Sequence, residues 1–334
     1  MYNNIKKDRD SSFDFIKGIL IFLVVWGHSI QFIANDFYQY NPIYIWIYSF
    51  HMPLFVFISG YFSINGIKLS FREFVLQKVR RLLIPAILWT LIFFGVKVIF
   101  GQISITSLWG GVQELYNSAR NAWFLYCLFA LNIMARLVYM SPHKVALTLF
   151  ILLIGYISNP YQPVDVLKHF QIFRQWPLFM LGLFSRDFEC MKYFTLSKNN
   201  KRSIIIFILM AGIYIIWFYF AAFKHQYLFS EEHYIIRGII LVLASIIFFN
   251  VFKMLYEISS QKHLALPFIC LGKNTLGIYM SNYIVIRILI FLVGNGFSEI
   301  VVFGLSIAIT LICFIITKVL RLFTVSRKYL LGEK

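Results

Sequence analysis

The residues of this chain best suited to chemistry lie on one apolar stretch near its start, where Asp14, Lys17 and His28 interrupt a run of aliphatic and aromatic residues. In a helix turning about 100° per residue, Lys17 and His28 fall within about 20° of the same face and roughly 16 Å apart along the axis. Asp14 precedes Lys17 by one helical turn and lies near the same stripe. One helix face therefore carries a carboxylate, an ammonium group and an imidazole that exchanges protons near neutral pH.

Asp14 and Lys17 also fit the simpler interpretation of membrane-surface anchors that reach toward water. His28 lies too deep in its apolar run for that, so the alternatives are a hydrogen-bonded structural histidine and a functional one, which we favour. A second histidine, His51, opens the next apolar stretch two residues before Pro53. If the connection is centred near Tyr38, His28 and His51 lie at similar depth and share a site; the alternative is a packed hairpin with an interfacial histidine.

A basic cluster of Lys78, Arg80 and Arg81 stands just before a third apolar stretch that begins with Leu-Leu-Ile-Pro. Such a cluster usually sets membrane topology or binds anionic lipid. Guanidinium groups also suit the phosphates of a soluble ligand, because their planar fork makes paired contacts. The charges alone leave both readings open.

The elements that must position these residues are membrane helices. Of 334 residues, 60% are hydrophobic and only 13% are charged, a composition that excludes disorder and argues against a water-soluble globule. A membrane-spanning helix needs about 20 apolar residues. The sequence predicts an all-α bundle of about ten such helices, of which the fifth and sixth are short: 13–34, 43–62, 82–100, 122–140, 144–158, 173–186, 203–222, 234–255, 271–292 and 299–320.

The distribution of charge tests this segmentation. With the N-terminus in the cytoplasm, 23 of the 31 lysines and arginines fall in cytoplasmic segments, which supports an even number of spans and two cytoplasmic termini. The same bias explains the net charge of +17 without a nucleic-acid partner. No loop is long enough for a soluble domain, so we expect residues 1–334 to form one transmembrane domain. The four scattered cysteines indicate neither a disulfide framework nor a metal site.

Taken together, these segments resemble membrane-bound acyltransferase family 3. The first helix is similar to the family's Asp-x-x-Arg-Gly opening and later Gly-His pair, here Asp14, Lys17, Gly18, Gly27 and His28. The stretch from Phe50 to Tyr61 resembles the Phe-His-Met-Pro-Leu-Phe-x-Phe-x-Ser-Gly-Tyr element, and Lys78 to Pro85 resembles the basic-Arg-Leu-x-x-Pro element. Weaker similarities follow in the family's order at residues 122–125, 176–182 and 271–279.

Two departures from the family pattern are visible. Lys17 stands where arginine is commoner, which keeps the charge but loses the planar fork. The family often has a histidine shortly after Tyr279, whereas this chain reads Met280-Ser281-Asn282, so no role is carried over to that position.

The resemblance implies an O-acyltransferase of a bacterial inner membrane that moves an acyl group, usually acetyl, from acyl-coenzyme A to a hydroxyl of a cell-surface glycan or its lipid-linked precursor. It implies His28 as the catalytic residue, either as a general base or as an acyl carrier. Asp14, Lys17 and His51 would support it, and Lys78, Arg80 and Arg81 would hold the donor's phosphates. Acyl-coenzyme A would be a co-substrate, with no cofactor bound permanently.

Four further residues are candidates for binding the acceptor. Glu114 and Arg120 lie on the longest outer loop, Trp123 opens the following helix, and Arg287 lies in the outer half of the ninth span.

Two other functions fit the same residues less well. A transporter of a small polar or glycolipid substrate would suit a bundle with buried charge, although the halves show no repeat. An electron carrier would need His28 and His51 to face each other across a haem.

Overall fold

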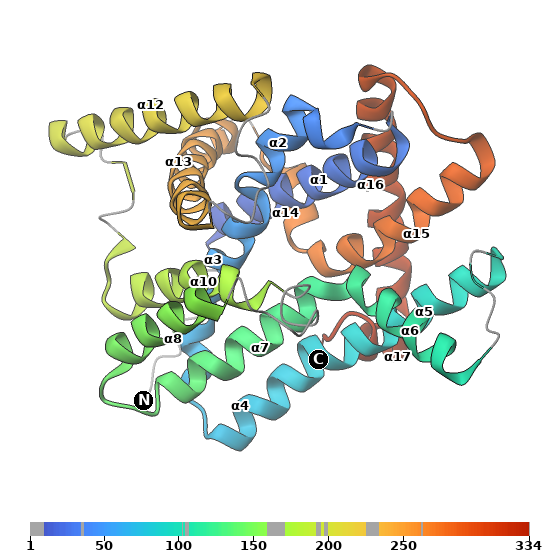
Figure 1. Cartoon of the computed structure of the whole chain (residues 1–334), viewed down its shortest axis with the longest axis horizontal. Coiled ribbons are helices and arrows are strands. Elements are labelled where there is room, and N and C mark those ends of the chain that lie inside the picture. The colour runs from blue at the N-terminus through green and yellow to red at the C-terminus, as the bar shows by residue number, and fades with distance from the viewer. Residues whose placement is uncertain are drawn as a thin grey trace.

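The computed structural model describes residues 10–34, 37–101, 103, 107–158, 171–191, 195–196, 200–224, 234–261 and 263–333. Every named element in these ranges is helical, and extended pairing is limited there to one isolated bridge between Ala34 and Phe297 (Figure 1). The elements are α1 (Ser11–Ile33), η1 (Tyr38–Tyr40), α2 (Pro42–Tyr48), α3 (His51–Ile67), α4 (Phe71–Lys78), η2 (Val79–Leu83), α5 (Ile84–Ile99), α6 (Leu108–Ala119), η3 (Arg120–Ala122), α7 (Trp123–Val138), α8 (Lys144–Ser158), α10 (Ile172–Asp187), α12 (Lys201–Phe223), α13 (Tyr234–Gln261), α14 (Leu266–Gly272), α15 (Thr275–Val293), α16 (Glu299–Leu322) and α17 (Thr324–Tyr329).

Eight helical segments in the described part of the chain are long and apolar enough to cross a membrane. They coincide with eight of the ten predicted spans, so the all-α membrane fold is confirmed. The other two predicted spans are α8 and α10, whose 15 and 16 residues fall short of a bilayer crossing. The count of ten and the cytoplasmic position of both termini stay predictions.

Local sequence explains where the helices begin. The Asp10 carboxylate accepts a hydrogen bond from the Ser12 backbone N–H at 2.9 Å and caps α1. Pro42 occupies the first turn of α2, where its missing N–H is not needed. Ser70 and Glu73 form a reciprocal capping box at the start of α4.

The predicted span 43–62 is not one continuous helix, because the chain breaks between α2 and α3 at Ser49 and Phe50. Pro53 then lies in the first turn of α3, where proline is tolerated. The His51 side chain compensates for the break, since its Nδ1 donates a hydrogen bond of 2.7 Å to the backbone carbonyl of Ile47 at the end of α2. The proline was the sequence signal for this interruption.

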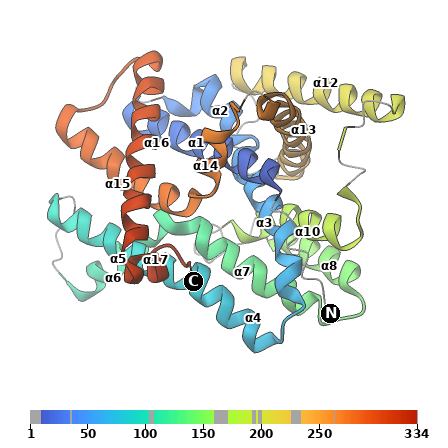
Figure 2. The ribbon, with the colours of Figure 1, turned by 180° about the vertical axis from the view of Figure 1, so that it is seen from behind.

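Two helix pairs meet backbone to backbone through glycines. A β-carbon on Gly60 of α3 would overlap the Phe179 carbonyl of α10, and one on Gly182 of α10 would overlap the Phe57 carbonyl of α3. Gly18 of α1 and Gly272 of α14 are related in the same way. Small residues permit this close approach of membrane helices, and it fixes α10 against α3 and α14 against α1 (Figure 2).

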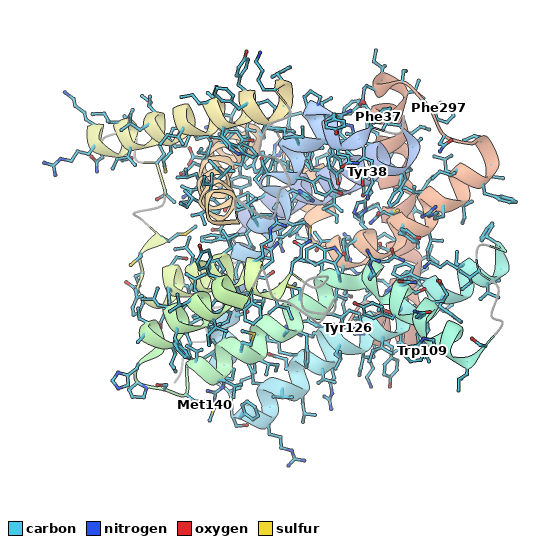
Figure 3. All side chains as sticks on the ribbon, in the orientation of Figure 1. Phe37, Tyr38, Trp109, Tyr126, Met140 and Phe297 are labelled. Atoms are coloured by element: carbon cyan, nitrogen blue, oxygen red, sulfur yellow. The ribbon has the colours of Figure 1, made fainter. Side chains whose placement is uncertain are left out.

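The two ends of the bundle are distinguished by the connections that meet there. At one end the Gly296 N–H donates a hydrogen bond of 2.8 Å to the Ile33 carbonyl, which ties the end of α1 to the α15–α16 connection. Phe37, Tyr38 and Phe297 lie together at this end, whereas Met140, after α7, lies at the opposite end (Figure 3). The predicted topology assigns the first end to the outside and the second to the cytoplasm.

Candidate active site

His28, on the outer half of α1, lines a cavity of about 280 Å³ that we call the chamber. His51, from the first turn of α3, lines the same chamber. The remaining wall comes from α2, the η3–α7 junction, the start of α10, α13 and α15. The structure therefore brings the two histidines to one site, and that site is built from elements spread over most of the chain.

Asn282 of α15 holds the His28 ring, with 2.8 Å between the His28 Nδ1 and the Asn282 Oδ1. The Asn282 amide nitrogen donates to the backbone carbonyls of Ile278 and Tyr279, so the amide oxygen must face His28. An oxygen can only accept, so the His28 Nδ1 carries the proton in the neutral ring. The Nε2 atom is left with its lone pair, as a base or a nucleophile requires.

His51 is more firmly tied into the structure than His28. It is only 2% exposed, its Nδ1 is bonded to Ile47, and the Tyr48 ring packs edge-on against it with 4.7 Å between ring centroids. This supports a positioning role for His51 beside a His28 that is half-buried in the chamber.

Two guanidinium groups, those of Arg120 and Arg174, line the chamber. Arg120 and Trp123, two of the four predicted acceptor residues, line it directly. Arg287 lies one layer behind, with its guanidinium over the rings of Phe32 and Tyr283, which are wall residues. Glu114 is not among the chamber residues and instead lies 3.9 Å from the Lys97 ammonium.

Two further cavities lie between the chamber and the opposite end of α1. A passage of about 200 Å³ shares Met52 and Tyr279 with the chamber, and a wider mouth of about 850 Å³ shares Lys17 and Ser59 with the passage. The order along α1 is therefore mouth, Lys17, passage and His28. The predicted stripe of Asp14, Lys17 and His28 runs along this series of cavities.

The mouth contains an ion pair and a separate cation. The Lys17 ammonium lies 2.7 Å from a carboxylate oxygen of Asp14, which is only 2% exposed. Arg186, at the end of α10, lines the mouth and places its guanidinium 4.7 Å from the centre of the Tyr61 ring. The mouth is therefore lined by two cations, Lys17 and Arg186, together with the carboxylates of Asp10, Asp14 and Glu189.

The predicted donor cluster lies beside the passage. Residues 79–83 form a turn of π-helix, because Pro85 cannot donate to the carbonyl of Arg81 four residues earlier. Leu82 of this turn lines the passage, whereas Arg80 and Arg81 are exposed and Lys78 lies over the Phe74 ring. None of the three cations is among the described lining residues of the chamber, passage or mouth.

Three residues at these cavities were not predicted from the sequence. Asn282 lies 254 residues from the histidine it holds, so only the tertiary structure pairs them. Arg174 and Arg186 stand near the two ends of α10 and line the chamber and the mouth. Charged residues in a short apolar helix were the available signal. Within the described residues, no three His, Cys, Asp or Glu side chains are grouped to hold a metal ion.

The structure thus places a half-buried histidine at a chamber inside a bundle of apolar helices. The comparison with known families is specific. The acyltransferase family 3 model, described as an acyltransferase domain, matches residues 10–319, and the chain belongs to this family. The resemblance inferred from the sequence motifs is therefore confirmed.

Two curated relatives are similar over part of their length. The chain is 37% identical to the nodulation protein NolL of Mesorhizobium japonicum over 138 residues, which are 39% of this chain and 36% of that protein. It is 36% identical to the nodulation protein NolL of Sinorhizobium fredii over 137 residues, which are 39% of this chain and 37% of that protein. The match thus spans little more than a third of either relative. No solved structure matches this chain.

Proposed function

We propose that this protein is a membrane O-acyltransferase. It would move an acyl group such as acetyl from acyl-coenzyme A to a hydroxyl of a cell-surface glycan or of its lipid-linked precursor. It would work as a multi-pass protein of the bacterial cytoplasmic membrane, taking the donor from the cytoplasm. The observation that carries the proposal is the row of mouth, passage and chamber along α1, which are neighbouring cavities with shared lining residues and the last of which contains His28.

The shape of these cavities suits the donor. Acyl-coenzyme A is anionic at one end and carries its thioester on a long thin arm. The nucleotide phosphates would remain at the mouth near Lys17 and Arg186, with Arg80 and Arg81 exposed on the turn whose Leu82 borders the passage. The apolar passage would take the arm, and the thioester would arrive at His28.

The proposed chemistry is direct transfer. The His28 Nε2 removes the proton from the acceptor hydroxyl as its oxygen attacks the thioester carbonyl carbon. The resulting oxyanion would be stabilised by the positive charge of Arg120 in the chamber wall. The carbon–sulfur bond then breaks, and the thiolate takes the proton back from the imidazolium, which leaves an ester and free coenzyme A.

The deciding experiment measures free coenzyme A thiol released by the purified protein from acetyl-coenzyme A, with and without membranes that supply the acceptor. We expect release that depends on these membranes and radiolabelled acetyl groups that become fixed to a glycan. Uptake of a substrate without any need for coenzyme A would instead indicate a transporter, and a Soret band in the purified protein would indicate haem.

Asn282→Ala should lower kcat about tenfold and leave both Michaelis constants nearly unchanged. The substitution removes a hydrogen bond worth about 0.5–1.5 kcal/mol and releases the His28 ring to the wrong tautomer. Ser281→Ala is the matched control, because the buried Ser281 hydroxyl donates to the Gly277 carbonyl of its own helix and Ser281 is not among the chamber residues. Equal effects of the two variants on kcat would show that Asn282 serves packing alone.

Replacing Arg80 and Arg81 together by glutamine should raise the Michaelis constant for the donor more than tenfold and change that for the acceptor little. Each charge-assisted contact is worth about 1.5–3 kcal/mol. The control is Lys68→Gln with Arg72→Gln, which removes two exposed cations from the same predicted inner segment. Topology should survive in both double variants, as cysteine-accessibility mapping will show, because most inner cations remain. An unchanged donor constant with correct topology would assign the cluster to lipid binding.

A further inference from the structure

A groove of about 560 Å³ between α8, α10 and α13 adjoins the chamber. Its wall is almost entirely hydrocarbon, with leucines of α8 on one side and residues 238–243 of α13 on the other. Leu149 and Leu153 are more than half exposed, so the groove is open sideways to the surroundings of the bundle. In Figure 1 the ribbon of α13 lies above those of α8 and α10.

The groove and the chamber are neighbours, because Arg174 and Leu241 line both. Arg174 stands in the first turn of α10, at the boundary between the hydrocarbon wall and the polar chamber. Arg120 adds a second guanidinium on the chamber side. A ligand that matches the groove, Arg174 and the chamber in that order has an apolar tail, then an anionic group, then a polar head.

We infer that the acceptor is a lipid-linked saccharide whose hydrocarbon tail lies in the groove, whose phosphate linkage lies at Arg174, and whose sugar hydroxyl reaches His28 in the chamber. This inference rests on the proposed function and narrows its acceptor to the lipid-linked class. The tail would enter from the bilayer between α8 and α13, while the donor arm enters through the passage on the other side of the chamber. Donor and acceptor would therefore be bound together.

The chain offers a direct way to obstruct the groove. A β-carbon on Gly238 of α13 would meet nothing within 4 Å, and this glycine lines the groove, so Gly238→Phe places a ring in the space proposed for the tail. Gly212 of α12 also has nothing within 4 Å and is not among the groove residues, so Gly212→Phe is the matched control. Leu153→Trp, with Leu209→Trp on α12 as its control, provides a second pair at exposed leucines.

The test incubates the full-length protein with radiolabelled acetyl-coenzyme A and membranes from cells that lack the gene, then separates solvent-extractable lipid from water-soluble polymer. We expect early label in the lipid fraction, released into water by mild acid that cleaves a sugar phosphate. Gly238→Phe and Leu153→Trp should each lower this label at least fivefold, whereas both control variants should leave it unchanged.

A binding measurement separates the groove from the chemistry. Farnesyl phosphate with a photoreactive tail should label residues of α8, α10 and α13 in the full-length protein. Unlabelled farnesyl phosphate should compete better than farnesol, inorganic phosphate should not compete, and Arg174→Gln should abolish the preference for the phosphate. Equal competition by farnesol in the unsubstituted protein would overturn the assignment of the anionic group to Arg174.

The remaining outcomes are distinct. Label that appears only in the polymer overturns the lipid-linked acceptor and leaves the acyltransferase proposal standing. Label in the lipid fraction that Gly238→Phe and Leu153→Trp do not lower overturns the groove as its binding site. Label in neither fraction, from a protein that is folded in detergent, overturns the proposed function itself.

Discussion

His28→Ala is expected to reduce acyl transfer by about 10²–10⁴-fold, the usual effect of removing a general base. The residue is half-buried at the chamber wall, and within the described part of the chain its ring is hydrogen-bonded to Asn282, so removal of the ring should leave the packing of α1 nearly intact. Transfer is measured as radiolabelled acetyl fixed to acceptor membranes. The thermal unfolding midpoint in detergent and correct membrane insertion verify that the variant is folded.

Two companion variants refine this test. His28→Gln keeps an amide donor for Asn282 but has no basic nitrogen, so it should be as inactive as the alanine variant. His51→Ala should lose less activity. The Nδ1 of His51 donates a hydrogen bond to the Ile47 carbonyl, and this geometry supports only a positioning role. Near-normal transfer by folded His28→Ala would remove His28 from the mechanism.

Lys17→Ala is expected to lose most activity, whereas Lys17→Arg should retain most of it. The lysine stands where mouth and passage meet, so any donor arm that reaches His28 by this route passes its ammonium group. Loss of a charge-assisted contact of about 1.5–3 kcal/mol would lower kcat/KM for the donor by roughly ten- to a hundredfold. The loss should appear in donor titrations and not in acceptor titrations.

The ion pair with Asp14 provides the control for this experiment. Lys17→Ala also removes one partner of a carboxylate that is only 2% exposed, and that change alone would destabilise the fold. The double variant Asp14→Asn with Lys17→Ala removes both charges and should recover stability in an unfolding titration. If it also recovers full activity, Lys17 serves only to neutralise Asp14; if the donor defect persists, Lys17 contacts the donor.

The linear arrangement of three candidate residues could be predicted from the sequence. Helical periodicity alone placed Asp14, Lys17 and His28 along one stripe, and in the structure these residues line three neighbouring cavities. The eight long spans could also be predicted from the sequence, because a run of about twenty apolar residues is typical of a membrane-spanning helix. These features depend on residues close together in the chain.

The walls of the site could not be predicted in the same way. Asn282 reaches His28 only because α15 packs against α1, and no local pattern encodes that contact. The helix α10 was expected to be a short span, whereas its glycine contact with α3 makes it a central element that carries Arg174 to the chamber and Arg186 to the mouth. Helix pairing through backbone contact leaves only scattered glycines as a trace in the sequence.

The wall of the passage has a consequence for the cell that would contain this protein. Most of its lining is hydrocarbon, from residues such as Ile21, Val24, Phe55, Leu125 and Leu128, with hydroxyl groups only from Ser59, Thr275 and Tyr279 among the described residues, and the Lys17 ammonium stands at one end. An ion entering this passage would lose its water shell without gaining other polar partners, which costs several kcal/mol. A cation would also be repelled by the Lys17 ammonium. A thin acyl arm meets neither penalty. The bundle would thus act as an electrical insulator while the arm is inside it, and the proton-motive force across the membrane would survive each turnover.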